Sequence, residues 1–135
     1  MPFIEWAEEY SVNVKEIDDQ HKGLFQIINN LNDAVSEGKA PGVIDATIHK
    51  MIEYANVHFA TEEKYMTKYH YPGYQEHKAE HDQFNLKSLE MNGRLKAGVY
   101  VMSTEILRFL KDWLTNHILV TDKKYGPCFN ENGLI

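Results

Sequence analysis

The 135-residue chain has one cysteine, few prolines and no long apolar run. With Cys128 alone, an intrachain disulfide is excluded, and such sparse cysteine is typical of a reducing compartment. The first residues carry neither a basic segment nor an apolar stretch, so we expect no signal peptide. No apolar run approaches the roughly 20 residues that a membrane-spanning helix needs. These absences predict a cytoplasmic protein without membrane insertion.

Basic charge is also scarce. The formal net charge is −6, whereas nucleic-acid binding needs a basic surface and anionic lipids attract lysine and arginine. We therefore expect neither nucleic acid nor a membrane surface as a partner. With 135 residues, 43% of them apolar, the chain is long enough for one domain with its own core. We expect that domain to be a monomer.

Apolar residues recur at three- and four-residue steps in four stretches, a spacing that indicates amphipathic helices. We expect helices from Asp18 to about 37, over 43–69, over 74–96, and from about 102 to 125 at the latest. Glycine and proline separate these stretches. Because short loops force antiparallel neighbours, the sequence predicts an all-α, up-down-up-down four-helix bundle. The single domain at 1–135 would then comprise an extended N-terminal arm (1–17), the bundle (18–125) and a C-terminal tail (126–135).

Five of the seven histidines, with two carboxylates, lie inside the four expected helices. The seven residues are His21, His58, Glu62, His77, His81, His117 and Asp122. In an antiparallel bundle, the starts of the first and third helices lie at the same end as the finishes of the second and fourth. All seven side chains should therefore meet at one end. The remaining histidines, His49 and His70, do not fit this geometry, and we expect them at the surface.

The spacing within each helix tests whether the residues share a face. Four-residue steps separate His58 from Glu62 and His77 from His81, so each pair lies one turn apart on one face. His117 and Asp122 are five residues apart, which is about 140° around a regular helix. Either the helix widens, tightens or unwinds near Val120, or one of the two is not a ligand. Because local widening is frequent at functional sites, we keep Asp122.

Taken singly, each motif is more typical of a solvated helix face or a core histidine than of a metal ligand. Together they favour metal, because two inward carboxylates would be costly to bury without a cation and no lysine or arginine occupies an inward position. Seven ligands are too many for one tetrahedral zinc. Imidazole and carboxylate without thiolate disfavour copper(I) and iron–sulfur clusters. Five histidines, two bridging carboxylates and a solvent-derived bridge suit two six-coordinate ions with one position open. The sequence thus predicts a di-iron or di-manganese centre, with iron the usual occupant.

The combined pattern resembles the hemerythrin family, and within it the single-domain bacterial members. The resemblance covers nearly the whole chain and includes the five-residue step. The matching motifs are His58-Phe59-Ala-Thr-Glu62, His77-x-x-x-His81, Trp113-Leu114…His117-Ile118 and Asp122…Tyr125.

This resemblance implies an assignment of the ligands. One iron would be held by three histidines (His77, His81, His117). The other would be held by His21 and His58 and would keep an open position. Glu62 and Asp122 would bridge the irons together with an oxo or hydroxo group, and dioxygen would be held as a hydroperoxide on the open iron. The matching oxygen-pocket positions are Phe59, Trp113, Leu114 and Ile118.

The function expected from the resemblance is reversible dioxygen binding for storage, transport or delivery, without enzymatic turnover. An oxygen-consuming enzyme would be a suitable recipient. The alternatives are an oxygen or redox sensor, and a di-iron oxidase or peroxidase acting on peroxide or nitric oxide. The pocket positions are apolar and offer no recognisable general acid or base, which weighs against the enzyme.

Overall fold

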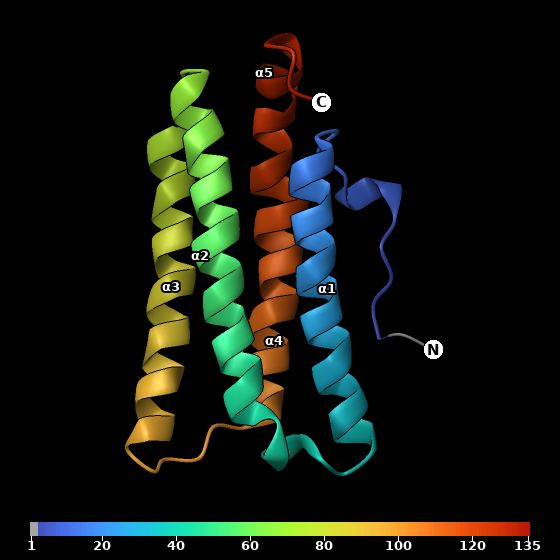
Figure 1. Ribbon diagram of the computed structural model, residues 1–135, viewed down its shortest axis with the longest axis vertical. Coiled ribbons are helices and arrows are strands. Elements are labelled where there is room, and N and C mark those ends of the chain that lie inside the picture. Colours follow the sequence, from blue (N-terminus) through green and yellow to red (C-terminus); the bar gives the residue numbers. More distant parts are fainter. Residues whose placement is uncertain (1–2) are drawn as a thin grey trace.

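The computed structural model describes residues 3–135, and every regular element in that range is helical. Four long helical segments form a bundle, and each runs antiparallel to its neighbours in the chain, as the sequence predicts (Figure 1). Three of them are α1 (Lys15–Ser36), α2 (Ile44–Lys68) and α3 (Tyr74–Lys96). The fourth begins as α4 (Ser103–Trp113), widens into a π-helix (Leu114–Thr121) and tightens into a 3-10 turn (Asp122–Tyr125). Two further 3-10 turns span Glu8–Tyr10 and Ala40–Gly42.

The first helix begins three residues before the expected Asp18. Asp18 instead lies in the first turn of α1, where an acidic side chain is favourable beside the helix N-terminus. Its carboxylate accepts hydrogen bonds from the backbone N–H of Val12 (2.9 Å) and the hydroxyl of Ser11 (2.6 Å). Asp18 therefore ties the N-terminal arm to the helix rather than starting the helix.

The core follows the apolar stripes that the sequence shows. Its largest cluster joins α1, α2, α3 and α4 through side chains such as Leu24, Ile48 and Phe84, all fully buried. The spacing of apolar residues in the first stretch predicts that Val35 points inward, and this prediction is wrong. Val35 is 39% exposed, and Ala34 is buried in its place near the end of α1. His49 and His70 are exposed, as predicted.

The segment predicted as a C-terminal tail is partly helical. Helix α5 (Gly126–Glu131) lies at the end of the bundle where α1 starts and α2 finishes (Figure 1). Phe129 of α5 and Tyr125 pack with Val12, Ile17 and Met66 in a second apolar cluster. Six residues are too few to show helical periodicity. Pro127 stands at a first-turn position, where proline favours the start of a helix.

Hydrogen bonds hold the N-terminal arm near both of its described ends. Residues 1 and 2 of the predicted arm lie outside the described residues. Ile4 exchanges two hydrogen bonds of 2.9 Å with the side-chain amide of Asn29 on α1. Further along, the ammonium group of Lys123 donates to the carbonyl of Ser11 (2.7 Å). The arm thus joins the first helix to the C-terminal part of the chain. Across residues 3–135, none of the helices combines the length and the hydropathy needed to span a bilayer.

Candidate metal centre

All seven predicted ligands lie together at one end of the bundle, and each is at most 1% exposed. Their nitrogen and oxygen atoms form two groups within which all ligand atoms lie within 4.8 Å of one another. One group contains three histidines and the other two, and both groups include Glu62 and Asp122. The three-histidine group has His77, His81 and His117; the two-histidine group has His21 and His58.

The two carboxylates lie between the histidines. Asp122 turns Oδ1 toward Nε2 of His77 and His117, each at 2.9 Å, and Oδ2 toward Nε2 of His21 at 3.0 Å. Oε1 of Glu62 lies 3.1 Å from Nε2 of both His58 and His81, one from each group. The other oxygen of Glu62 accepts a hydrogen bond from the Tyr125 hydroxyl. Each carboxylate therefore reaches both histidine groups.

The π-helix explains how residues five apart in sequence meet. In a π-helix the hydrogen bonds run between residues i and i+5, so a five-residue step returns close to the same face. His117 lies within the π-helix, and Asp122 follows directly after it. Of the alternatives that the spacing of His117 and Asp122 leaves open, the structure has the widened helix.

Most of the ligand atoms approach one another without hydrogen-bond geometry. Nε2 of four histidines (His21, His58, His77, His117) and both oxygens of Asp122 are buried and have no hydrogen-bond partner among the described residues. Buried polar atoms are normally paired, because leaving them unpaired costs free energy. Imidazole nitrogens and carboxylate oxygens that converge in this way fit cations held between them.

Three histidines are oriented by a side chain on a neighbouring helix. Nδ1 of His58 lies 2.6 Å from Oε1 of Gln20, Nδ1 of His81 lies 2.9 Å from Glu63, and Nδ1 of His117 lies 2.8 Å from Glu80. A proton on Nδ1 satisfies these contacts and leaves Nε2 free to bind metal. The sequence analysis missed these three residues. Each is adjacent in sequence to a predicted ligand but contacts the ligand of another helix.

Protons balance the charges of the cluster when no metal is bound. Burial disfavours protonation of His77, but the nearby carboxylates of Asp122 and Glu62 prevail and raise its pKa to about 10. The pKa of His117 is raised to about 9, because the charge of Asp122 and the hydrogen bond to Glu80 outweigh its burial. Burial lowers the pKa of His58. Although burial alone would raise them, the pKa values of Glu62 and Asp122 are held below their ordinary values by the surrounding histidines, His58 and His117 foremost.

Residues 12–129 match the family model of the hemerythrin HHE cation binding domain. The chain belongs to the hemerythrin family. It is 37% identical to bacteriohemerythrin of Methylococcus capsulatus (strain Bath), a match that covers 96% of this chain and 99% of the relative. Myohemerythrin of Theromyzon tessulatum is 33% identical, with 90% of this chain and 89% of the relative covered.

Solved hemerythrin structures share the fold. A wild-type hemerythrin crystal structure superposes with a TM-score of 0.85 at 36% identity, covering 93% of this chain and 97% of the other. A crystal structure of a leucine-to-alanine hemerythrin mutant superposes with a TM-score of 0.86 at 36% identity. The match covers 95% of this chain and 98% of the other. Hemerythrins carry a di-iron centre, and the buried cluster of this chain is able to bind two metal ions. Which residue holds which iron stays a prediction.

The four predicted pocket residues of this hemerythrin are buried beside the cluster. The ring of Phe59 stacks on His81 and that of Trp113 stacks on His117, each with centroids 3.9 Å apart. Leu114 and Ile118 lie on the π-helix with His117 and belong to the main core. Their role in holding oxygen stays a prediction.

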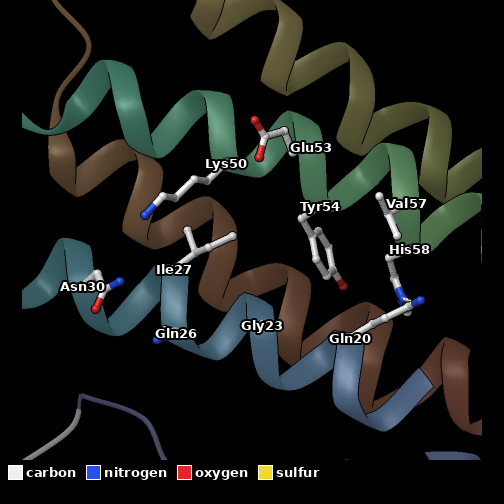
Figure 2. A pocket seen from close by; sticks show the side chains of 10 residues that line it. All are labelled: Gln20, Gly23, Gln26, Ile27, Asn30, Lys50, Glu53, Tyr54, Val57 and His58. Carbon is white, nitrogen blue, oxygen red and sulfur yellow. Dashed lines mark hydrogen bonds between the residues drawn. The ribbon is translucent and has the colours of Figure 1, made fainter. Parts of the chain in front are cut away.

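A surface groove of about 460 Å³ runs between α1 and α2 as far as His58 of the two-histidine group (Figure 2). Gln20 and His58 line one end of it, and Lys50 and Asn30 the other. Tyr54 lines the groove next to His58. The sequence analysis did not single out Tyr54, although it lies one helical turn before a predicted ligand.

Proposed function

We propose that this hemerythrin binds dioxygen reversibly at a di-iron centre held by the seven clustered residues. The observation that carries the proposal is the unequal division of the histidines around two shared carboxylates. The three-histidine group would hold one iron with His77, His81, His117 and the two carboxylates. The two-histidine group would offer the other iron one histidine fewer, which would leave a position for oxygen beside His21 and His58.

Bound iron would supply electrons to dioxygen, while the side chains control what reaches it. Gln20, Glu63 and Glu80 hold three ligand rings in place. Burial of the cluster among Phe59, Trp113 and other apolar side chains excludes the water that would displace bound oxygen. The hydroperoxide form of bound oxygen stays a prediction from the family resemblance.

Hemerythrins bind oxygen and are not enzymes, and we extend that property to this chain as part of the proposal. Metal analysis of the freshly purified protein, followed by anaerobic reduction and oxygen titration, tests it. We expect two irons per chain and a visible spectrum that appears with oxygen and disappears when oxygen is removed. Fewer than two irons in a fully loaded sample would contradict the proposal.

The same titration separates the other functions. Steady consumption of peroxide or nitric oxide would indicate the oxidase or peroxidase, and an oxygen-dependent association with another protein would indicate the sensor. Delivery to an oxygen-consuming enzyme, the monomeric state and a cytoplasmic location stay predictions from the sequence.

A further inference from the structure

One residue of the N-terminal arm, Ser11, binds two different helical segments of the bundle. Its hydroxyl donates to Oδ2 of Asp18 in the first turn of α1, at a distance of 2.6 Å. Its backbone carbonyl accepts from Nζ of Lys123 at 2.7 Å, and Lys123 lies in the 3-10 turn Asp122–Tyr125. Ser11 is 8% exposed. It therefore forms a buried link between the start of α1 and the end of the fourth helical segment.

Each segment that Ser11 links carries a predicted ligand next to the link. Asp18 lies three residues before His21, so the two are neighbours on the surface of α1. Lys123 directly follows Asp122 in the chain. These two ligands also approach each other, because Nε2 of His21 lies 3.0 Å from Oδ2 of Asp122. Ser11 thus joins, from outside the cluster, the two segments whose ligands approach each other inside it.

The arm has a defined backbone conformation around Ser11. The backbone N–H of Val12 donates to the second oxygen of Asp18 at 2.9 Å, and that of Asn13 donates to the hydroxyl of Ser11 at 3.0 Å. Asn13 has a φ of 60°, in the left-handed region that asparagine enters more readily than most residues. The carboxylate of Asp18 and the hydroxyl of Ser11 therefore satisfy the backbone of a tight turn as well as each other.

The same turn lies closely against the chain that follows Asp122. A Cβ atom placed on Gly126 would lie 3.0 Å from the carbonyl oxygen of Val12, so a larger residue there would press on the arm. The side-chain amide of Asn130 donates to the carbonyl of Asn13 at 3.0 Å. Val12 itself is 2% exposed. Because of these contacts, the arm cannot shift without moving the segment that carries Asp122.

We propose that the link formed by Lys123, Ser11 and Asp18 positions part of the metal centre. It sets the distance between His21 and Asp122, and with it how firmly the two-histidine group holds its cation. The inference rests on the proposed function in requiring iron in the cluster, but it does not require oxygen binding. The three-histidine group has one histidine more and depends less on this distance. Weakening the link should therefore loosen one iron and leave the other in place.

Lys123→Met tests the proposal, because it removes the donor and keeps an unbranched side chain. The reduced, iron-loaded protein is mixed without oxygen with a chelator that becomes coloured on binding ferrous iron, and the release of the first and the second iron is timed. We expect the first iron to leave about fivefold faster, as for the loss of one hydrogen bond of ordinary net strength, and the second at the unaltered rate. Lys123→Arg, which still donates, should restore the slower release. Lys124→Met is the matched control, because it removes the same charge at an exposed position one residue later and should change neither rate.

A double variant that combines Lys123→Met with Asp18→Asn tests whether the two contacts act as one link. Both run through Ser11, so their effects on the release of the first iron should not multiply, and the double variant should resemble the stronger single variant. Unchanged release in Lys123→Met, equal acceleration of both irons, or effects that multiply would overturn the proposal. Equal acceleration together with a lower melting temperature would show that the link only stabilises the fold. Iron release does not require an oxygen cycle, so a failure of reversible oxygenation is distinguishable from a failure of this inference.

Discussion

The side chains that orient the histidines differ in charge between the two groups. Glu63 and Glu80 contact histidines of the three-histidine group, whereas Gln20, a neutral amide, contacts His58 of the two-histidine group. A carboxylate partner makes an imidazole a stronger donor to metal than an amide partner does. We therefore expect the three-histidine iron to be the more firmly held of the two.

Glu80→Gln tests this expectation. Glu80 accepts hydrogen bonds from His117 and, at 2.9 Å, from the hydroxyl of Thr121. Glutamine can keep one of these hydrogen bonds without the negative charge. We expect iron to leave about tenfold faster in the presence of a chelator, at the lower end of the range for such partners. Glu76→Gln, an exposed position one turn earlier on α3, is the control and should release iron at the ordinary rate. Equal rates for both variants would mean that the charge of Glu80 contributes nothing.

Leu114 is the second residue with a testable role. It is 4% exposed, three residues before His117, and belongs to the predicted oxygen pocket. Leu114→Ala removes apolar volume and should speed oxygen exchange or autoxidation, because water reaches the centre more easily. Val120→Ala, on the same π-helix but 51% exposed, is the control. Both rates are measured by stopped-flow spectroscopy, and no change in either would exclude a gating role for Leu114.

At the scale of the helices, the sequence shows the stripes and the ligand positions more clearly than the helix ends. The buried line through Ile48, Met51 and Ala55 continues to His58 and Glu62, so one periodicity predicts both core and ligands on α2. The sequence predicts that the first helix begins at Asp18, but the side chain of Asp18 instead binds the arm. The partners Gln20 and Glu80 could not be predicted, because their contacts depend on how neighbouring helices are rotated against each other.

A polar clamp joins α3 to α4. The carboxylate of Glu105 lies 2.9 Å from the ammonium of Lys87 and 2.5 Å from the guanidinium of Arg94. These hydrogen bonds, that of Arg94 foremost, lower the pKa of Glu105 to about 2. Its folded-state pKa lies below the ordinary value, so its contribution to stability is present above about pH 4.5 and is lost as the pH falls toward about 2.

Glu105→Gln should therefore lower the melting temperature near neutral pH by a few degrees at most, since the clamp is half-exposed and screened by solvent. The difference between the variant and the unaltered protein should shrink as the pH falls toward about 3, as followed by circular dichroism. A difference that stays constant over this range would show that ionisation of Glu105 is not the cause.

For the molecule as a whole, the cluster makes stability depend on what balances two buried carboxylates. Without metal, protons on His77 and His117 do so, with pKa values of about 10 and 9. Both values lie above the ordinary histidine value, so this contribution is complete below about pH 6.5 and is lost as the pH rises through about 9 to 10. Bound cations would balance the charges of the two carboxylates in place of these protons.

We therefore expect the metal-free protein to melt at a lower temperature at about pH 10 than at about pH 7. The melting temperature of the iron-loaded protein should fall less over the same pH interval, so the stabilisation by iron grows with pH. Differential scanning calorimetry of both forms measures this. If the melting temperatures of the two forms fell equally with pH, the protons of His77 and His117 would not be what balances the charges of the cluster.

His117 and Asp122 are the last of the seven predicted ligands to be synthesised. Synthesis runs from the N-terminus, so α1, α2 and α3 with four of the five clustered histidines exist before His117 and Asp122 do. The ammonium of Lys123 and the amide of Asn130 then hold the carbonyls of Ser11 and Asn13 in the arm. A growing chain therefore offers only part of a metal site, and iron should enter after the last helix has docked.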